Sequence, residues 1–162
     1  MIKTNAIVLS LSKHDDRSML LHAYTRERGY LSIYIYGAGG RRHTLGLYLP
    51  LNAVSLVVDT PPDRPARLRE STLLATHNYT PMQQMAALTI AEVALRSMHE
   101  PLPDPAVYEL LLSTAAMLEH EEAQKIVPPF LVALSRLLGY GGQMLDEWNS
   151  LSSLAMYHEL IQ

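Results

Sequence analysis

The sequence predicts an α+β protein in which a small β-barrel comes first and a set of helices follows. Short apolar or alternating runs separated by turn residues fill the first 78 residues, and such runs are typical of strands. From residue 81 onward the apolar side chains recur at helical spacing. Charge divides the chain near the same point: residues 1–80 hold ten Lys and Arg against six Asp and Glu, whereas residues 81–162 hold three against ten. We therefore predict a basic β domain over 1–78 and an acidic helical domain over 79–162.

Composition limits the class of protein. With 48% hydrophobic and 18% charged residues, the 162-residue chain is predicted to fold into a globular structure. No apolar run approaches the roughly 18 residues needed to span a bilayer, and the N-terminus lacks the apolar core of a signal peptide. The chain has no cysteine, which excludes disulfides and thiolate metal sites. We expect a cytoplasmic protein.

Five strands are predicted in the first domain. The clearest covers Tyr30–Tyr36, which alternates so that Ser32, Tyr34 and Tyr36 share one face. The turn before it ends in Gly29, at a position where a positive φ favours glycine. Five short strands with turn signals between them suggest a small sandwich or a closed barrel, and the five-stranded oligonucleotide-binding (OB) barrel fits this size. The other predicted strands cover residues 3–11, 18–25, 51–59 and 67–76.

About four helices are predicted in the second domain. Thr80 followed by Pro81 is a helix cap with proline at the first helical position, and the same signal recurs before the second helix. Gly139 is expected to end the third helix as a glycine C-cap. Pro128 and Pro129 are expected to precede or begin that helix. The predicted helices cover residues 81–98, 106–120, 128–138 and 144–161.

A basic, glycine-rich loop follows the third strand. Gly37, Gly39 and Gly40 lead into Arg41 and Arg42. The loop lacks the Gly-Lys-Ser/Thr ending of a P-loop, and an arginine stands where a dinucleotide-binding fingerprint needs its third glycine. Two interpretations stay open. The loop is either a flexible connection between strands, or a basic finger that contacts phosphates through its arginines and backbone N–H groups.

The tyrosines that lead into this loop also have two interpretations. Tyr34 and Tyr36 are either half-buried sheet residues or platforms for bases, whose stacking contributes about 1–3 kcal/mol per base. Farther upstream, His14, Asp15 and Asp16 have the residue types of a metal or hydrolytic site. No second cluster lies at matching spacing, so a polar turn explains them better. We predict that the protein is not an enzyme, with no catalytic residue, no metal and no cofactor.

The first half also carries a recognisable series of motifs. Ile7-Val8-Leu9 is followed by Met19-Leu20-Leu21, by the turn Tyr24-Thr25-Arg26-Glu27-Arg28-Gly29 and by Leu49-Pro50-Leu51. This series resembles the RecO family of bacterial recombination mediators, and a looser similarity extends the match to about residue 142. The resemblance implies a DNA-repair protein with an N-terminal OB-fold and a helical domain, associated with the nucleoid.

The resemblance also implies partners and site residues. Members of the family bind single- and double-stranded DNA, anneal complementary strands, and load RecA together with RecR and the single-strand-binding protein SSB. Carried over to this chain, the DNA-binding candidates are Lys13, Arg17, Arg26, Arg28, Arg41 and Arg42, to which Tyr34 and Tyr36 are added as candidate base platforms.

Three departures from the family pattern affect these expectations. Many members hold a four-cysteine zinc site that this cysteine-free chain lacks, and most are longer. Many also place arginines at the start of the third helix to receive the tail of SSB, whereas Pro128 and Pro129 stand here. Two functions therefore stay open: a non-catalytic DNA-binding protein of recombinational repair, or a protein–protein adaptor in the repair complex that has lost DNA binding.

Overall fold

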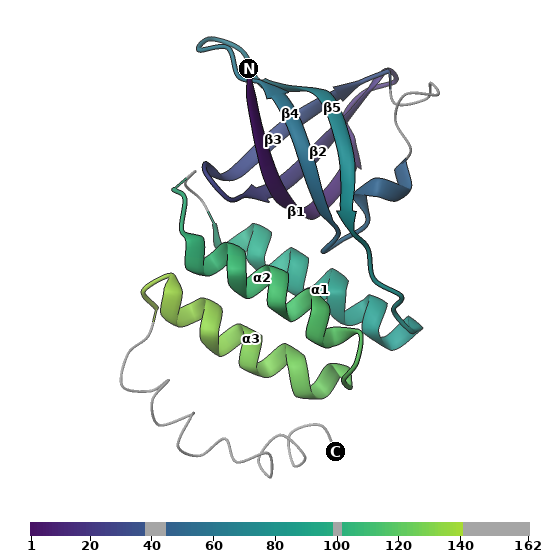
Figure 1. Cartoon of the computed structure of the whole chain (residues 1–162), viewed down its shortest axis with the longest axis vertical. Coiled ribbons are helices and arrows are strands. Elements are labelled where there is room, and N and C mark those ends of the chain that lie inside the picture. The colour runs from purple at the N-terminus through teal and green to yellow at the C-terminus, as the bar shows by residue number, and fades with distance from the viewer. Residues whose placement is uncertain (38–44, 99–101, 141–162) are drawn as a thin grey trace.

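The barrel and the helices form two layers, one stacked on the other (Figure 1). A computed structural model describes residues 1–37, 45–98 and 102–140. In this part of the chain five strands are followed by three helices, which confirms the predicted α+β fold. The N-terminus lies at the end of the barrel that points away from the helices (Figure 1). None of the helices in the described ranges is long and apolar enough to cross a bilayer.

The five strands close into a barrel in the order β1-β2-β3-β5-β4. Neighbouring strands are antiparallel except for β3 and β5, which pair in parallel. The predicted five-stranded barrel is therefore confirmed, and each strand begins and ends within two residues of the predicted bounds. The elements are β1 (Ile2–Lys13), β2 (Ser18–Thr25), β3 (Gly29–Tyr36), the short 3₁₀ helix η1 (Leu45–Tyr48), β4 (Ala53–Asp59) and β5 (Ala66–Ala75).

The long strand β1 serves both sides of the barrel. Its first half pairs with β4 and its second half pairs with β2, with an irregular register between Val8 and Ser10. A bulge of this kind bends a strand and increases its twist, which helps one strand to belong to two sheets. Both faces of β1 are buried, since Ala6 and Val8 point into the barrel and Ile7 and Leu9 point toward the helices.

The first two helices begin with the predicted caps. In α1 (Pro81–Ser97) the Thr80 side chain accepts a hydrogen bond from the Gln83 N–H, and the Gln83 side chain accepts one from the Thr80 N–H, which forms a capping box. In α2 (Pro105–Leu118) the Asp104 carboxylate accepts from the Ala106 N–H at 2.8 Å. Each cap satisfies N–H groups that have no partner inside the helix.

The third helix differs from the prediction at its start. α3 covers Ala123–Leu137, so Pro128 and Pro129 lie inside it instead of before it or at its beginning. The prediction was wrong because proline favours the first turn of a helix, but a helix already begun can continue past proline at a local cost. Gly139 follows the end of α3 with φ +80°, as predicted for a glycine C-cap. The predicted fourth helix, over 144–161, lies outside the described residues.

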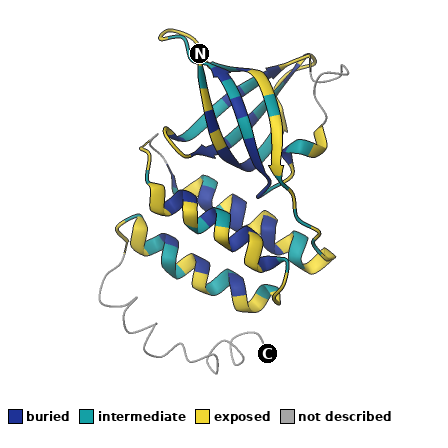
Figure 2. Ribbon diagram, in the orientation of Figure 1, coloured by how far each residue is buried: buried dark blue, intermediate teal, exposed yellow. Residues whose placement is uncertain are grey.

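Two separate clusters of buried residues hold the fold together (Figure 2). The inner core fills the barrel, and all its buried members come from the barrel or from η1, as in the case of Tyr48. The junction core lies between the outside of the barrel and the helices. It combines helical residues such as Ile90 and Leu111 with barrel residues such as Ile7 and Tyr24. The helices thus pack on apolar side chains that the barrel supplies.

Candidate nucleic-acid interface

The outer face of the β2–β3 hairpin is the first candidate site. Oligonucleotides bind OB barrels on the face of strands 2 and 3, together with the loops between strands 1 and 2 and between strands 4 and 5. In this hairpin Leu21 and Ile33 pair across the strands and point into the barrel. The neighbouring pair, Leu20 and Tyr34, therefore points outward, as alternation along a strand requires. The prediction that Tyr34 and Tyr36 share one face follows the same alternation.

Tyr34 and Tyr36 form a stacked pair on this face. Their ring centroids are 6.1 Å apart and the ring planes differ by 19°. The His14 ring meets the Tyr34 ring edge-on, with centroids 4.8 Å apart. Tyr36 is 50% exposed, whereas Tyr34 is half-buried. The pair therefore presents aromatic surface to solvent, and such a surface can stack on a base of any sequence.

Arg67 joins the tyrosine pair from a distant part of the chain. As the second residue of β5, it pairs with Tyr34 in the parallel pairing of β3 with β5, and its guanidinium carbon lies 5.3 Å from the centroid of the Tyr36 ring. Arginine over an aromatic face is held by a cation–π attraction. The prediction from sequence missed Arg67, because no spacing in the chain indicates that the start of the fifth strand lies against the end of the third.

The β1–β2 turn brings more basic residues to the same end of the hairpin. The backbone oxygen of Arg17 accepts a hydrogen bond from the Gly37 N–H at 2.9 Å, which places Arg17 beside the end of β3. Asp15 shapes the turn by accepting from the Arg17 N–H at 2.7 Å, and this bond lowers the pKa of the Asp15 carboxyl below its ordinary value of 3.8. Lys13 forms an ion pair with Asp16 at 3.0 Å. The prediction of a polar turn is consistent with these roles.

Two arginines in the described part of the chain lie near the tyrosine pair without a close ion pair. Arg69 forms an ion pair with Asp59 at 2.9 Å, so part of its charge is offset, as it is for Lys13. Within residues 1–37, 45–98 and 102–140, no ion pair is made by Arg17 or Arg67. Arg67 lies opposite Asp59 in the pairing of β4 with β5 and, after the hydrogen bond from Arg69, its charge helps to lower the pKa of the Asp59 carboxyl. Both Arg17 and Arg67 are candidates to contact a phosphate near Tyr36.

Arg26 and Arg28 lie at the opposite end of the hairpin. Arg17 and Arg26 flank the eight-residue strand β2, so about 30 Å of extended chain separates them. The Arg26 guanidinium lies 3.8 Å from the Glu109 carboxylate and 5.7 Å from the centre of the Tyr108 ring, both on α2. The structure thus places Arg26 at the junction with the helices and does not bring it together with the tyrosine pair. Arg28 shares the same turn.

The remaining predictions concern the loop and the metal. Arg41 and Arg42 lie outside the described residues, which stop at Gly37 and resume at Leu45. Gly37, the last residue described before the loop, has φ +71°. Across the described ranges no group of three His, Cys, Asp or Glu side chains could hold a metal ion.

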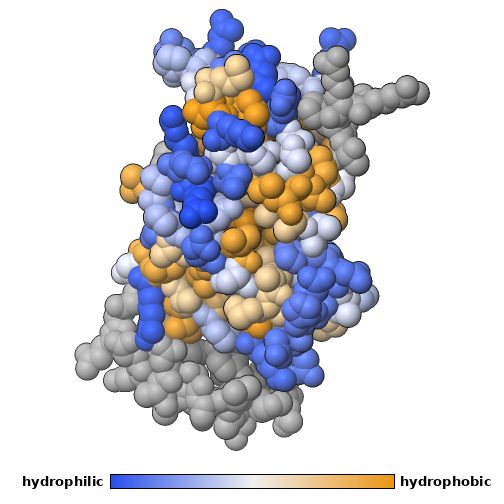
Figure 3. Space-filling view, in the orientation of Figure 1, coloured by the Kyte–Doolittle hydropathy of each residue, from blue (hydrophilic) through white to orange (hydrophobic). Residues whose placement is uncertain are grey.

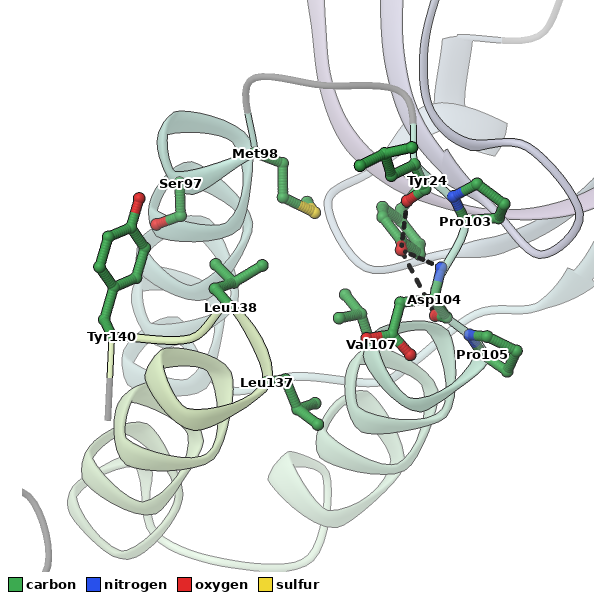
Figure 4. Close-up of a pocket in the computed structure, with 11 residues that line it drawn as sticks. Tyr24, Ser97, Met98, Pro103, Asp104, Pro105, Val107, Leu137, Leu138 and Tyr140 are labelled. Atoms are coloured by element: carbon green, nitrogen blue, oxygen red, sulfur yellow. Dashed lines mark hydrogen bonds between the residues drawn. The ribbon is translucent and has the colours of Figure 1, made fainter. Parts of the chain in front are cut away.

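The second candidate site is a hollow at the junction of the barrel and the helices (Figure 4). Its volume is about 590 Å³, and apolar side chains such as Met98, Val107 and Leu138 form much of its lining. The Tyr24 hydroxyl accepts a hydrogen bond from the Asp104 N–H at 2.9 Å and lies 3.3 and 3.4 Å from the carbonyl oxygens of Asp104 and Leu102. Burial raises the pKa of this hydroxyl. Because it is committed to backbone groups, the hydroxyl serves the junction and is a poor candidate for chemistry.

Comparison with known proteins agrees with the fold. The model of the recombination protein O N-terminal domain matches residues 1–77, and that of the recombination protein O C-terminal domain matches residues 81–147. The "DNA repair protein RecO" of Pelodictyon phaeoclathratiforme (strain DSM 5477 / BU-1) is 29% identical over 146 residues. The aligned region covers 86% of this chain and 56% of that relative, so the chain spans little more than half the length of the curated protein it matches. Since the two domain models match in order and leave only 78–80 and 148–162 unmatched, the chain belongs to the RecO family of DNA repair and recombination proteins.

Proposed function

We propose that this chain is a non-catalytic DNA-binding protein of recombinational repair, and that it holds single-stranded DNA on the outer face of the β2–β3 hairpin. The observation that carries the proposal is the stacked pair of Tyr34 and Tyr36 with Arg67 over the Tyr36 ring. Unpaired bases expose flat faces that stack on aromatic rings, and the adjoining phosphates attract arginine. Residues 1–78 are the proposed DNA-binding domain and 79–162 the proposed helical domain.

The mechanism requires no bond to be made or broken, and the RecO family consists in general of non-catalytic mediators. Stacking separates the bases of a bound strand from one another, while Arg17 and Arg67 neutralise phosphates beside them. A strand held in this way keeps its pairing edges available to a complementary strand, which favours annealing. Contacts to phosphates alone carry no sequence information, so the same residues also suit double-stranded DNA at lower affinity.

Within this proposal the chain works with RecR and SSB in loading RecA, at the nucleoid. RecR and DNA are the partners that membership of the family favours. The SSB contact has less support: the family resemblance implies arginines at the start of the third helix, and the prolines expected in their place, Pro128 and Pro129, lie inside α3. Proline has no side-chain donor for an acidic peptide, so any SSB contact must use other residues.

Binding of a labelled oligo-dT strand, followed by fluorescence anisotropy, tests the proposal. Tyr36→Ala removes one stacking surface and is expected to weaken binding about tenfold or more. Tyr36→Phe keeps the ring and is the matched control, so its affinity should stay close to that of the unmodified chain. If the unmodified chain does not bind oligo-dT at low salt, DNA binding by this chain is refuted.

The salt dependence separates the two ends of the hairpin. Removing one cation that neutralises a phosphate should lower the slope of log K against log salt by about 0.7 on a single strand. We expect that reduction for Arg17→Gln and for Arg67→Gln. Arg26→Gln is the control, because Arg26 lies 3.8 Å from Glu109 at the junction. An equal reduction for Arg26→Gln would move the site toward the helices.

An adaptor function is the second candidate, and one observation favours it. Leu73 and Leu74 on β5 are 37% and 51% exposed, and Figure 3 shows apolar atoms over the end of β5 nearest the helices. An exposed apolar strand suits contact with another protein. Retention of RecR by the purified chain, with no shift of any oligonucleotide, would favour the adaptor over the DNA-binding protein.

A further inference from the structure

Three polar side chains meet on the outer face of the hairpin, between the tyrosine pair and the helices. His22 on β2 lies opposite Ser32 on β3, and Tyr30 stands two residues before Ser32 on the same strand. The Tyr30 hydroxyl is 2.6 Å from His22 Nδ1 and 3.0 Å from the Ser32 hydroxyl, which is itself 3.1 Å from Nδ1. Together the three residues form the histidine cluster. Strand pairing alone brings them together, since no sequence spacing groups them.

The two rings of the histidine cluster meet edge to edge. Their planes differ by only 9° and their centroids are 5.8 Å apart. Rings that lie over one another are separated by about 3.5 Å, the contact distance of carbon atoms. The 2.6 Å bond between His22 Nδ1 and the Tyr30 hydroxyl is shorter than that separation, so the rings do not overlap face to face. The bond is therefore a directed hydrogen bond that fixes the orientation of the imidazole.

The neighbours of Nδ1 favour one tautomer. Two hydroxyls lie within hydrogen-bond distance of this nitrogen, that of Tyr30 at 2.6 Å and that of Ser32 at 3.1 Å, and each can donate to it. A ring nitrogen that accepts from these hydroxyls carries no proton of its own. In the neutral imidazole the proton is then on Nε2. Burial lowers the pKa of His22 from its ordinary value of 6.5, which favours this neutral form near pH 7.

The Nε2–H donor of His22 makes no hydrogen bond within the described part of the chain. No hydrogen bond joins Nε2 of His22 to any described residue, and Nε2 is not among the buried nitrogens that lack a partner there. It is therefore not fully enclosed by the protein. Ser32 and Tyr34 are successive outward residues on β3, so His22 lies roughly 7 Å along the hairpin from the Leu20–Tyr34 pair. An oriented N–H donor on a half-buried side chain thus stands next to the proposed base platform.

We infer that His22 is a further contact residue of this face, donating a hydrogen bond from Nε2–H to an acceptor oxygen of single-stranded DNA, with Tyr30 and Ser32 as positioning residues. This inference rests on the proposed DNA binding of the β2–β3 hairpin. The acceptor is an oxygen of a phosphate or of a base, and both have the same chemistry toward an N–H donor. The assigned tautomer matters, because only Nε2–H presents a donor outward.

The first test uses His22→Phe, which keeps an aromatic ring and removes the donor. Its affinity for oligo-dT should fall about tenfold, which corresponds to one hydrogen bond to a charged or strongly polar acceptor. His22→Gln keeps an N–H donor at similar reach and should recover part of the loss. Repeating both measurements on an abasic strand of equal length identifies the acceptor: a loss that persists indicates a phosphate oxygen, and a loss that disappears indicates a base oxygen.

A second test needs no change at His22. Nitrogen-15 NMR of the imidazole should show the Nε2–H tautomer in the unmodified chain, and addition of oligo-dT should shift the Nε2 resonance. The double variant Tyr30→Phe, Ser32→Ala removes both hydroxyls, so it should mix the tautomers and weaken binding less than His22→Phe does. A purely structural role for the two hydroxyls would change the tautomer and leave affinity unchanged.

The outcomes separate this inference from the proposed function. If the unmodified chain binds oligo-dT, Tyr36→Ala weakens binding and His22→Phe does not, then the contact by His22 is overturned while the proposed function stands. An Nε2 resonance of His22 that does not shift at saturating oligo-dT would also overturn the contact by His22. This measurement uses the unmodified chain, so it does not depend on whether a variant folds. If the unmodified chain does not bind, both proposals fail together.

Discussion

The inner core and the junction core differ in what each half of the molecule supplies. All buried residues of the inner core belong to the barrel or to η1, so the barrel closes around its own side chains. In contrast, the junction core needs both halves, since Ile7 and Tyr24 of the barrel, and Leu51 just before β4, pack among residues of all three helices. The helices therefore depend on the barrel for their packing surface. The interior of the barrel contains no helical residue of α1, α2 or α3, so it does not depend on these helices. We call this the one-way dependence.

Removing one leucine from each core gives the largest expected effect. Leu56 in the inner core and Leu111 in the junction core are both fully buried. Replacement by alanine should cost about 2–5 kcal/mol in either place, because a cavity remains and apolar burial is lost. Leu56→Ala should speed amide hydrogen exchange in β2 and in α2 alike. Leu111→Ala should speed exchange mainly in α2, as measured by mass spectrometry of peptides from each half.

The pair of variants also tests the one-way dependence. Each leucine variant is the control for the other, since the residue type, the burial and the substitution are the same. Equal acceleration of β2 and α2 exchange in Leu111→Ala would show that the two cores unfold as one cooperative unit, and the one-way dependence would then be refuted.

A glycine at the junction gives the next largest effect. Gly29 and Gly37 have nearly equal positive φ angles, +69° and +71°, which alanine adopts at a cost of roughly 1–2 kcal/mol. A Cβ at Gly29 would lie 2.5 Å from the Leu102 carbonyl oxygen, whereas a Cβ at Gly37 would meet no atom within 4 Å. Gly29→Ala should therefore lower the free energy of unfolding more than Gly37→Ala does, as measured by urea denaturation. Equal losses in the free energy of unfolding would mean that the turn at Gly29 and the backbone at Leu102 can move apart without cost.

The smallest expected effect concerns pH and the link between the two halves. The Glu119 carboxylate on the C-cap of α2 accepts from the Asn78 N–H at 3.0 Å and from His77 Nδ1 at 3.2 Å. These bonds, the backbone one first, lower the pKa of Glu119 from its ordinary value of 4.5. A carboxyl with a lowered pKa stabilises the fold above its ordinary pKa, and this stabilisation is lost as pH falls through the lowered value.

Urea denaturation between pH 7 and pH 3 measures this link. Glu119→Gln should remove part of the acid-dependent loss of stability, because its amide does not ionise. Glu121→Gln is the matched control, since Glu121 is an exposed carboxylate 3.9 Å from Lys125, whereas Glu119 bonds to His77 and Asn78. If both variants retain the full acid dependence, the bonds from Glu119 to His77 and Asn78 do not contribute to stability.

The strands could be predicted from sequence because burial imposes a period of two on them. Alternation along Tyr30–Tyr36 places Tyr34 and Tyr36 on one face, which the structure shows to be the outward one, and the polar residues before Ser18 locate the first turn. The start of α3 could not be predicted in this way. Pro128 signalled a helix start, but the helix begins at Ala123, and packing of its apolar side chains on the junction core outweighs the lost backbone bonds.

The candidate site was only partly predictable, because charge type says nothing about which end of a strand a residue occupies. The family resemblance groups Arg17 with Arg26 as DNA-binding candidates, yet they flank opposite ends of β2. Arg67 and His22 were missed since their positions depend on pairing between strands: Arg67 pairs beside Tyr34 and His22 lies opposite Ser32. The pairing register between strands is set by the whole barrel, so it cannot be read from the sequence pattern of a single strand.

The barrel is closed by a short seam. In the described residues β3 joins β5 through only two residue pairs, Ile33–Ala66 and Tyr34–Arg67, whereas the β2–β3 ladder has eight. The second of these pairs is also part of the proposed base platform. A DNA strand that contacts Tyr34 and Arg67 at the same time would connect β3 with β5 across this short pairing. Because such a strand binds the closed barrel, its binding would also stabilise the closed barrel by mass action. The shortest strand pairing in the barrel is therefore the one that a bound DNA strand would stabilise most directly.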